Sequence, residues 1–166
     1  RFMMEIPIVV PDDDDIMQSL VFDTKFHDVD TLINSLKANV LKFDKLNDFS
    51  HIVQNEIEAS ETLRNYALNL WRATKKPTDY GVKVSGVDMN RLVLSGASPR
   101  GMSMMLRAAR VNAWLNERLS VTPEDIHAVL HSTVAHRLVF SPVYEMRRTE
   151  IARDLLTGII NAVAAP

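Results

Sequence analysis

The chain has 166 residues, of which 46% are hydrophobic and 24% charged, ordinary values for a globular protein of one or two small domains. Its formal net charge of −2 argues against extensive contact with nucleic acid, and the lack of cysteine excludes disulfides and thiolate metal sites. No apolar run approaches the roughly 18 residues that span a membrane. We therefore expect a cytoplasmic protein without a membrane partner. Because the sequence begins with Arg1 rather than Met, we also expect either an internal piece of a longer protein or a processed product.

The first thirty residues combine an apolar run with a strongly acidic one. Phe2–Val10 is apolar and ends at Pro11, a pattern that predicts a buried strand of a mostly parallel sheet. Such a strand needs neighbours, which must come from outside this short segment. The acidic run Asp12–Asp15 then predicts the start of a helix, because acidic side chains favour the N-terminal end of the helix dipole.

The rest of the chain has a predominantly helical pattern. We predict a helix around Val29–Ala38, an irregular stretch near Leu41–Lys45 and a short helix near Asn47–Gln54. Hydrophobic periodicity and capping residues then predict four longer helices, which start after Ser60, Ser98 and Thr122 and at Arg148. They are expected to end near Pro77, Leu119, Arg137 and Val163, and to share one core that contains Leu63, Leu70, Trp71, Ile126, Leu130 and Leu155.

The helix start after Ser98 has an unusual charge. Ser98 is a typical N-cap residue and Pro99 suits the first helical position, but Arg100 follows where the dipole disfavours a cation. The helix after Thr122 has the same cap and proline, followed by two acids. Arg100 is therefore either a solvated arginine or part of a site where the helix N-terminus and the guanidinium together hold an anion.

Other candidate sites are weaker. Arg107 and Arg110 share a face with Arg100 by helical spacing, which predicts either an exposed basic face or a wider anion-binding surface. His127 and His131 lie four residues apart, with His136 nearby, but no carboxylate follows at a supporting position, so we expect no metal site. The roles of these histidines stay open. The five glycines form no phosphate-binding loop, so we expect the chain alone to be inactive.

Four short segments occur in a fixed order: Gly96–Arg100 (GASPR), Arg107–Arg110 (RAAR), Val121–Ile126 (VTPEDI) and His136–Leu138 (HRL). Together they resemble the C-terminal, lid portion of the MoxR family of AAA+ ATPases. The resemblance is dense over Leu92–Phe140 and looser over Ser60–Pro77. One departure is Gly101, where alanine is commoner in the family, and we interpret it as a glycine tolerated in the first helical turn.

The resemblance implies a mainly α fold. Residues 29–166 would form a helical AAA+ lid bundle, and residues 1–28 the last strand and helix of a truncated α/β core. It also implies site residues: Arg100 as the sensor-2 arginine, Ser98 and Arg107 as further nucleotide-binding candidates, and Arg1, in the remnant of a D-R-F segment, as a candidate arginine finger. ATP and Mg²⁺ would be held mainly by an upstream core with Walker A and Walker B motifs.

The resemblance further implies a lid that couples ATP binding and hydrolysis to chaperone-like assembly or activation of client complexes. Its partners would be the neighbouring subunits of a homo-oligomeric, usually hexameric, ring and von Willebrand factor A-type or other client proteins. An alternative is a non-catalytic interaction module that keeps the lid fold as an adaptor or contacts nucleic acid. A phosphate-binding loop upstream in the gene would favour the ATPase. The client cannot be identified from the residues.

Overall fold

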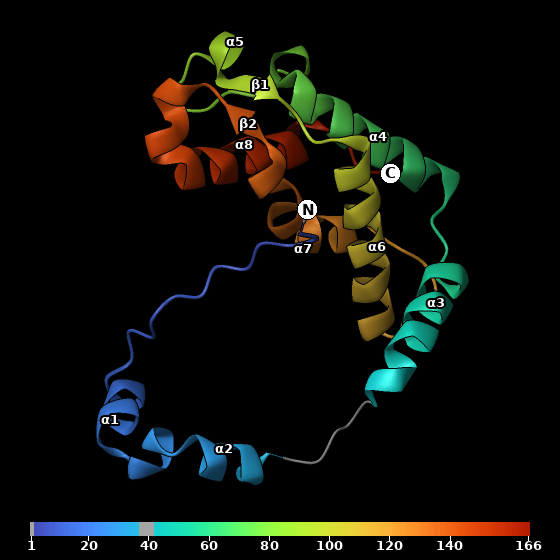
Figure 1. Ribbon diagram of the computed structural model, residues 1–166. Helices are drawn as coiled ribbons and strands as arrows, with labels where there is room; N and C mark the ends of the chain where they lie inside the picture. The colour runs from blue at the N-terminus through green and yellow to red at the C-terminus, as the bar shows by residue number, and fades with distance from the viewer. Residues whose placement is uncertain (1, 37–41) are drawn as a thin grey trace. The chain divides into compact units, whose positions relative to one another are not determined.

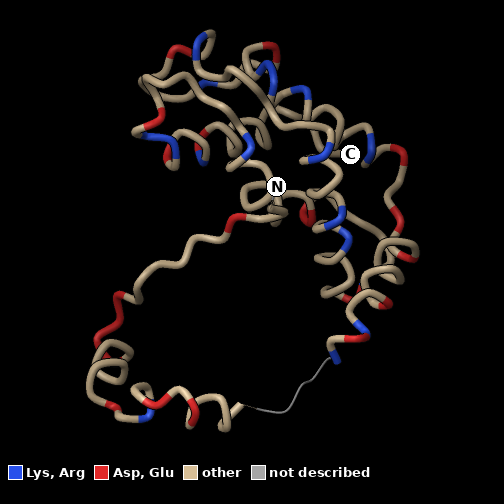
Figure 2. The backbone as a smooth tube through the Cα atoms, in the orientation of Figure 1, with Lys and Arg blue, Asp and Glu red and all other residues tan. Residues whose placement is uncertain are grey.

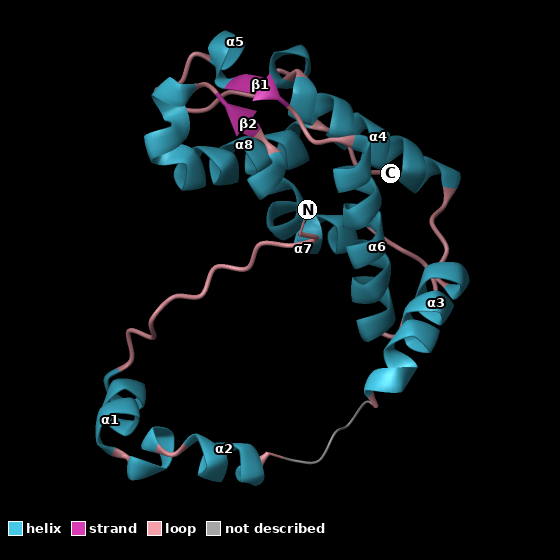
Figure 3. Cartoon of the chain, in the orientation of Figure 1, coloured by secondary structure: helices cyan, strands magenta, loops and turns pink. Residues whose placement is uncertain are grey.

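The computed structural model describes residues 2–36 and 42–166 (Figure 1). The chain divides into two compact units. The larger contains residues 2–5 and Ser50–Pro166, and the smaller falls within Ile6–Phe49. Figure 3 shows that helices dominate the described chain, with one small pair of strands. The predicted mainly α fold class is therefore confirmed.

The smaller unit is built from short, exposed elements. They are α1 (Asp14–Phe22), η1 (Thr24–His27), α2 (Val29–Ser35), η2 (Phe43–Lys45) and the first turn of α3 (Leu46–Glu56). Asp13 caps α1, because its Oδ1 accepts hydrogen bonds from the N–H groups of Asp15 and Ile16, both at 3.0 Å. The acidic run thus begins a helix as predicted. Part of the helix expected to reach Ala38, and Leu41, lie outside the described residues.

The segment 2–10 differs from the sequence-based prediction, because it forms no strand. Ile8 and Val10 are exposed, with 95% and 76% of their surfaces accessible. A strand requires a neighbour to pair its backbone groups, and no described residue pairs with this segment in a sheet. The apolar pattern is real, but its pairing partner is not among the described elements.

The larger unit contains the predicted helical bundle. Its helices are the rest of α3, α4 (Glu61–Lys75), α5 (Met89–Leu92), α6 (Pro99–Leu115), α7 (Pro123–Val134) and α8 (Arg148–Ala162). Short 3₁₀ helices connect them: η3 (Pro77–Tyr80), η4 (Ala135–Arg137) and η5 (Pro142–Arg147). The helix starts predicted at Ser60, Ser98 and Thr122 are all confirmed. The helix after Ser98 ends at Leu115, four residues earlier than predicted.

The larger unit also contains two short strands that the hydrophobic pattern of the sequence did not predict. β1 (Val93–Ser95) pairs antiparallel with β2 (Val139–Phe140), with Val93 opposite Phe140 and Ser95 opposite Val139. The N–H of Ser141 extends this contact by donating to the Leu92 carbonyl at 2.9 Å. The strand pair therefore joins the segment that precedes α6 to the segment that follows α7 (Figure 1).

One hydrophobic core holds the bundle together. Leu70, Ile126 and Leu155 are completely buried, and Leu63 and Leu130 nearly so. Trp71 packs against this core but is only half-buried. Five of the six residues predicted for the core are therefore fully in it, and the sixth lies at its edge.

Trp71 lies at the edge because its indole holds the segment before α6. Its Nε1–H donates to the Ala97 carbonyl at 2.6 Å. Thr74 completes the contact, since its hydroxyl accepts from the Ala97 N–H at 3.2 Å and donates to the Trp71 carbonyl at 2.7 Å. The C-terminal turn of α4 thus binds both backbone groups of Ala97, which is 1% exposed.

Gly96 is required by the same contact. A Cβ atom at this position would lie 2.7 Å from the Thr74 carbonyl oxygen and 2.8 Å from the Lys75 Cα. Both are backbone atoms that cannot turn aside. The glycine of the GASPR segment therefore allows the backbone to approach α4 closely, and this approach fixes where α6 begins.

An ion pair with a buried carboxylate joins the segment after α6 to the start of α7. Asp125 is completely buried, and its carboxylate accepts two hydrogen bonds of 2.6 Å from the Arg118 guanidinium. It also accepts from Asn112 at 2.8 Å and from the Thr122 N–H at 2.8 Å, which completes a capping box. Burial opposes ionisation of Asp125, but these hydrogen bonds outweigh it and lower the pKa from 3.8 to about 2.

This pKa shift predicts an acid-sensitive contribution to stability. A folded-state pKa below the unfolded value stabilises the fold above about pH 4, and this stabilisation is lost as the pH falls towards about 2. We expect the contribution to be about 2 kcal/mol. Urea unfolding of wild type and Asp125→Asn should show a large stability difference at pH 7 that shrinks towards pH 2. A difference that is independent of pH would contradict this account.

Replacing Trp71 should separate packing from hydrogen bonding. Trp71→Ala removes half-buried packing and the donor to Ala97, so we expect a loss of about 2–3 kcal/mol, below the cost of truncating a fully buried tryptophan. Trp71→Phe keeps most of the packing and should cost about 1 kcal/mol, because only the donor is lost. Chemical denaturation at neutral pH measures both. If the two variants lose the same free energy of unfolding, the hydrogen bond to Ala97, and not the packing of the ring, provides most of the stabilisation by Trp71.

Candidate functional site

The candidate site is the N-terminal turn of α6, which the α4 contact holds in place. Ser98 Oγ accepts from the Gly101 N–H at 3.1 Å, and Pro99 occupies the first helical position. The Ser98 carbonyl accepts from the Met102 N–H at 3.1 Å, which starts the helical ladder. The Ser98 hydroxyl is therefore engaged as a cap. Arg100 lies in the first turn of α6, which is fixed by the contacts of α4 with Ala97 and by the Ser98 cap.

Arg100 is exposed, and within residues 2–36 and 42–166 its guanidinium forms no hydrogen bond or ion pair. Arg100 forms no structural pair with the acids that begin α7: Asp125 is bound by Arg118, and Glu124 is exposed with no ion pair to Arg100. The exposure of Arg100 agrees both with a solvated arginine and with an anion-binding site. Arg100 thus presents an uncompensated positive charge at a helix end that is itself partly positive.

Figure 2 shows several basic positions along α6. Besides Arg100, the helix carries one arginine whose side chain is unpaired among the described residues and one that is hydrogen-bonded to the bundle. Arg107 is exposed and its guanidinium has no partner in the described part of the chain, although its carbonyl accepts from Gln54 Nε2 at 3.2 Å. Arg110 is structural: its Nε donates to the Ile57 carbonyl at 3.1 Å and its Nη1 to Gln54 Oε1 at 3.4 Å. Of the predicted basic face, Arg100 and Arg107 are therefore available to an anion.

Arg1, the candidate arginine finger, lies outside the described residues. The residue after it is described: the Phe2 carbonyl accepts a hydrogen bond from Arg137. Arg137 was not among the predicted site residues. The signal that could have found it is its place in the HRL segment, which served the sequence analysis only as a marker of resemblance.

Gly101 has a closer neighbour than the sequence analysis assumed. A Cβ at this position would lie 2.7 Å from Cδ of Arg137. The residue is therefore more than a tolerated glycine, because its missing side chain leaves room for the arginine from η4 beside the first turn of α6.

The histidines do not converge on one point. His127 Nε2 lies 2.7 Å from the Tyr66 hydroxyl, and His131 is exposed. Burial, together with the Glu124 charge, raises the pKa of that tyrosine. His136 Nε2 lies 3.4 Å from the Phe2 carbonyl. Among the described residues, no group of three or more histidines or acids is placed to hold a metal ion.

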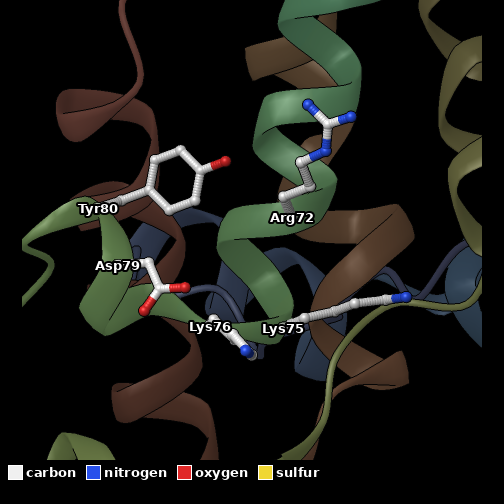
Figure 4. Close-up of a pocket in the computed structure, with 5 residues that line it drawn as sticks. All are labelled: Arg72, Lys75, Lys76, Asp79 and Tyr80. Carbon is white, nitrogen blue, oxygen red and sulfur yellow. The ribbon is translucent and has the colours of Figure 1, made fainter.

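A second basic region lies at the C-terminal end of α4, the end that also contacts Gly96 and Ala97. A pocket of about 420 Å³ is lined by Arg72, Lys75, Lys76, Asp79 and Tyr80 (Figure 4). Lys75 Nζ stacks 4.1 Å from the centre of the Trp71 ring, and in Figure 4 the three basic side chains point in different directions. Cations are expected at a helix C-terminus because the dipole favours them there. The pocket is therefore less specific for an anion than the start of α6.

A search of the described residues finds no helix with the length and hydrophobicity that a membrane span needs.

The comparisons with known proteins agree with the helical architecture. The model of the AAA lid domain family matches residues 89–156, which include β1, α6, α7 and β2.

Individual relatives extend this match to the whole chain. Protein MoxR of Methylorubrum extorquens is 43% identical over all 166 residues, which span 48% of its own length. Chaperone MoxR1 of Mycobacterium tuberculosis is 31% identical over 105 residues, 63% of this chain and 26% of that protein. The crystal structure of a candidate ATPase from Cytophaga hutchinsonii superposes with a TM-score of 0.76 at 23% identity, covering 100% of this chain and 47% of that one.

The chain thus spans about half the length of the Methylorubrum relative, and the lid model, the full-length identity and the fold all agree. The chain belongs to the MoxR family of AAA+ ATPases and carries the family's lid region.

Proposed function

We propose that this chain is the sensor and lid portion of an ATPase, and that Arg100 reports the presence of ATP phosphates to the lid. The observation that carries the proposal is the exposed, unpaired guanidinium of Arg100 on a helix start that α4 and Ser98 hold in place. A planar guanidinium is suited to phosphate oxygens because it offers paired donors. Arg107 and the Ser98 cap would support the same site.

The residues present fit a nucleotide phosphate but not its metal ion. An arginine at a helix N-terminus combines two sources of positive charge, which is the chemistry that an anion requires. The described residues offer no acidic cluster for Mg²⁺. We therefore propose that Mg²⁺ and most of the ATP are bound by a separate core with phosphate-binding motifs. ATP would supply the free energy of hydrolysis, and this chain would supply positive charge and movement of the lid.

The remaining parts of the proposal rest on family membership. Arg1 would serve as an arginine finger in a neighbouring subunit of a homo-oligomeric, hexameric ring. A boundary near residue 28 would separate the end of the core from the lid over residues 29–166. The Mycobacterium relative is named a chaperone, which supports a chaperone-like role in the assembly or activation of client complexes. Von Willebrand factor A-type proteins are candidate partners.

The 166-residue chain alone should not hydrolyse ATP, because it has no phosphate-binding loop. Arg100 can provide only a minority of the phosphate contacts, so nucleotide affinity should also be weak. Phosphate release and titration calorimetry with the purified chain test both expectations. Sustained turnover by the clean chain would contradict the assignment of the chemistry to a separate core.

In a polypeptide that joins the nucleotide-binding core to this chain, Arg100→Ala should lower kcat by about 10- to 150-fold. A charge-assisted hydrogen bond contributes about 1.5–3 kcal/mol, and phosphate charge shifts in the transition state. Arg100→Lys should recover little, because an ammonium lacks the planar fork.

The matched control is Arg153→Ala, which removes an exposed arginine from α8, away from the start of α6. Turnover and ATP affinity should be measured at equal oligomer concentration. A normal kcat for Arg100→Ala would remove this residue from the active site, and the non-catalytic interaction module would then become the better account.

A further inference from the structure

Arg137 connects three separate segments of the larger unit. Its Nε donates to the Thr133 carbonyl at 2.8 Å, which anchors the side chain on the last turn of α7. From there its Nη2 reaches Met104 Sδ, at 3.0 Å, and the Phe2 carbonyl. One half-buried guanidinium thus contacts α7, α6 and the segment that follows Arg1.

The first turn of α6 is shaped to admit this side chain. Gly101 is buried, and a Cβ there would lie 2.7 Å from Arg137 Cδ and 3.4 Å from its Nε. The arginine therefore lies against α6 at Gly101 and Met104. Any larger residue at position 101 must shift the Arg137 side chain from this position.

Residues 2–5 make further contacts with the same region. The Glu5 N–H donates to the Ser132 carbonyl at 2.8 Å, and His136 Nε2 lies 3.4 Å from the Phe2 carbonyl. Met3 packs against the core. Residues 132–137 thus provide the backbone contacts of this short segment, and Met3 and Met4 also line a pocket with Ala108 and Val129.

We propose that Arg137 is a positioning residue that ties residues 2–5 to the first two turns of α6. The helix start that presents Arg100 and the segment that follows Arg1 then move together. A shift of α6 on phosphate binding is passed to the Phe2 backbone through Arg137, without a direct contact of Arg137 with ATP. This inference rests on the proposed function of Arg100. It adds a physical link between the helix start that presents Arg100 and residues 2–5.

The contact between Arg137 and residues 2–5 can be tested without an activity assay. Hydrogen exchange of the Glu5 amide in the 166-residue chain reports whether residues 2–5 stay attached to Ser132. We expect Arg137→Ala to raise its exchange rate at least tenfold, while amides in α8 exchange as in wild type. Arg153→Ala should leave the Glu5 rate unchanged. An unchanged Glu5 rate in Arg137→Ala would overturn the proposal.

Gly101→Ala provides an independent perturbation of the same contact. The added Cβ should displace Arg137 and raise the Glu5 exchange rate as Arg137→Ala does. In the Arg137→Ala background, the same substitution should add nothing further, because the side chain that it displaces is gone. Additive effects of the two substitutions would contradict a shared mechanism.

The link to catalysis is tested in the polypeptide that contains the nucleotide-binding core. Arg137→Ala should lower kcat at least tenfold with little change in KM, because ATP contacts are retained. Arg137→Lys should recover little, since one ammonium cannot serve Thr133, Met104 and Phe2 together.

An engineered disulfide between residues 5 and 132 should restore turnover in the Arg137→Ala variant. The 166 residues contain no cysteine, so Glu5→Cys with Ser132→Cys introduces one new pair where a backbone hydrogen bond already joins the two segments. In the Arg137→Ala background, the oxidised pair should restore most of the lost kcat, and reduction should remove the gain.

The outcomes separate this inference from the proposed function. A loss of turnover in Arg100→Ala together with normal turnover in Arg137→Ala would overturn the positioning role alone. Normal turnover in Arg100→Ala would overturn the proposed function. Failure of the oxidised pair to restore kcat would show that Arg137 acts by some means other than holding residues 2–5.

Discussion

The close approach of the Gly96–Ala97 backbone to the end of α4 is the constraint on which the candidate site depends. Thr74 and Trp71 bind the N–H and the carbonyl of Ala97, and Gly96 leaves no side chain to separate the two backbones. A helix that starts from a mobile loop would present its first residues in many directions. Here the chain enters α6 from a buried, hydrogen-bonded position, so the direction of its first turn is set by the core.

The buried acid of the bundle is engaged far from Arg100. Asp125 lies at the opposite end of α6, where its carboxylate binds Arg118, Asn112 and the Thr122 N–H. Arg110 is likewise engaged, by Gln54 and the Ile57 carbonyl. The residues that stabilise the bundle are thus paired with one another, whereas the Arg100 guanidinium has no partner among the described residues. Arg100 contributes no packing to the core, which is why its substitution should affect function without unfolding the lid.

Much of the helical bundle could be predicted from the sequence, because its signals are local. The caps at Ser60, Ser98 and Thr122 and the apolar stripes around Leu70, Ile126 and Leu155 appear within single turns of helix. The β1–β2 pair could not be predicted in this way, since strands of two and three residues show no alternation. The apolar run Phe2–Val10 failed as a strand prediction for the opposite reason. Its local pattern was clear, but a strand also needs a pairing partner, and local pattern contains no information about partners.

The site shows the same division between local and non-local information. Ser98 and Arg100 were found from the capping pattern and the helix dipole, both of which are properties of neighbouring residues. The roles of Gly101 and Arg137 depend on a contact across 36 positions of the chain, and that of Phe2 on one across 135. No spacing rule connects such residues, so only the folded arrangement brings them together.

The most direct measurement of the central claim is a crystal structure of the core-and-lid polypeptide with a non-hydrolysable ATP analogue. The account predicts that the Arg100 guanidinium lies within hydrogen-bond distance, about 2.7–3.2 Å, of a terminal phosphate oxygen. It also predicts that the contacts of Ala97 with Trp71 and Thr74 are unchanged from those described here. An Arg100 side chain that remains in solvent while the nucleotide is fully bound would contradict the account.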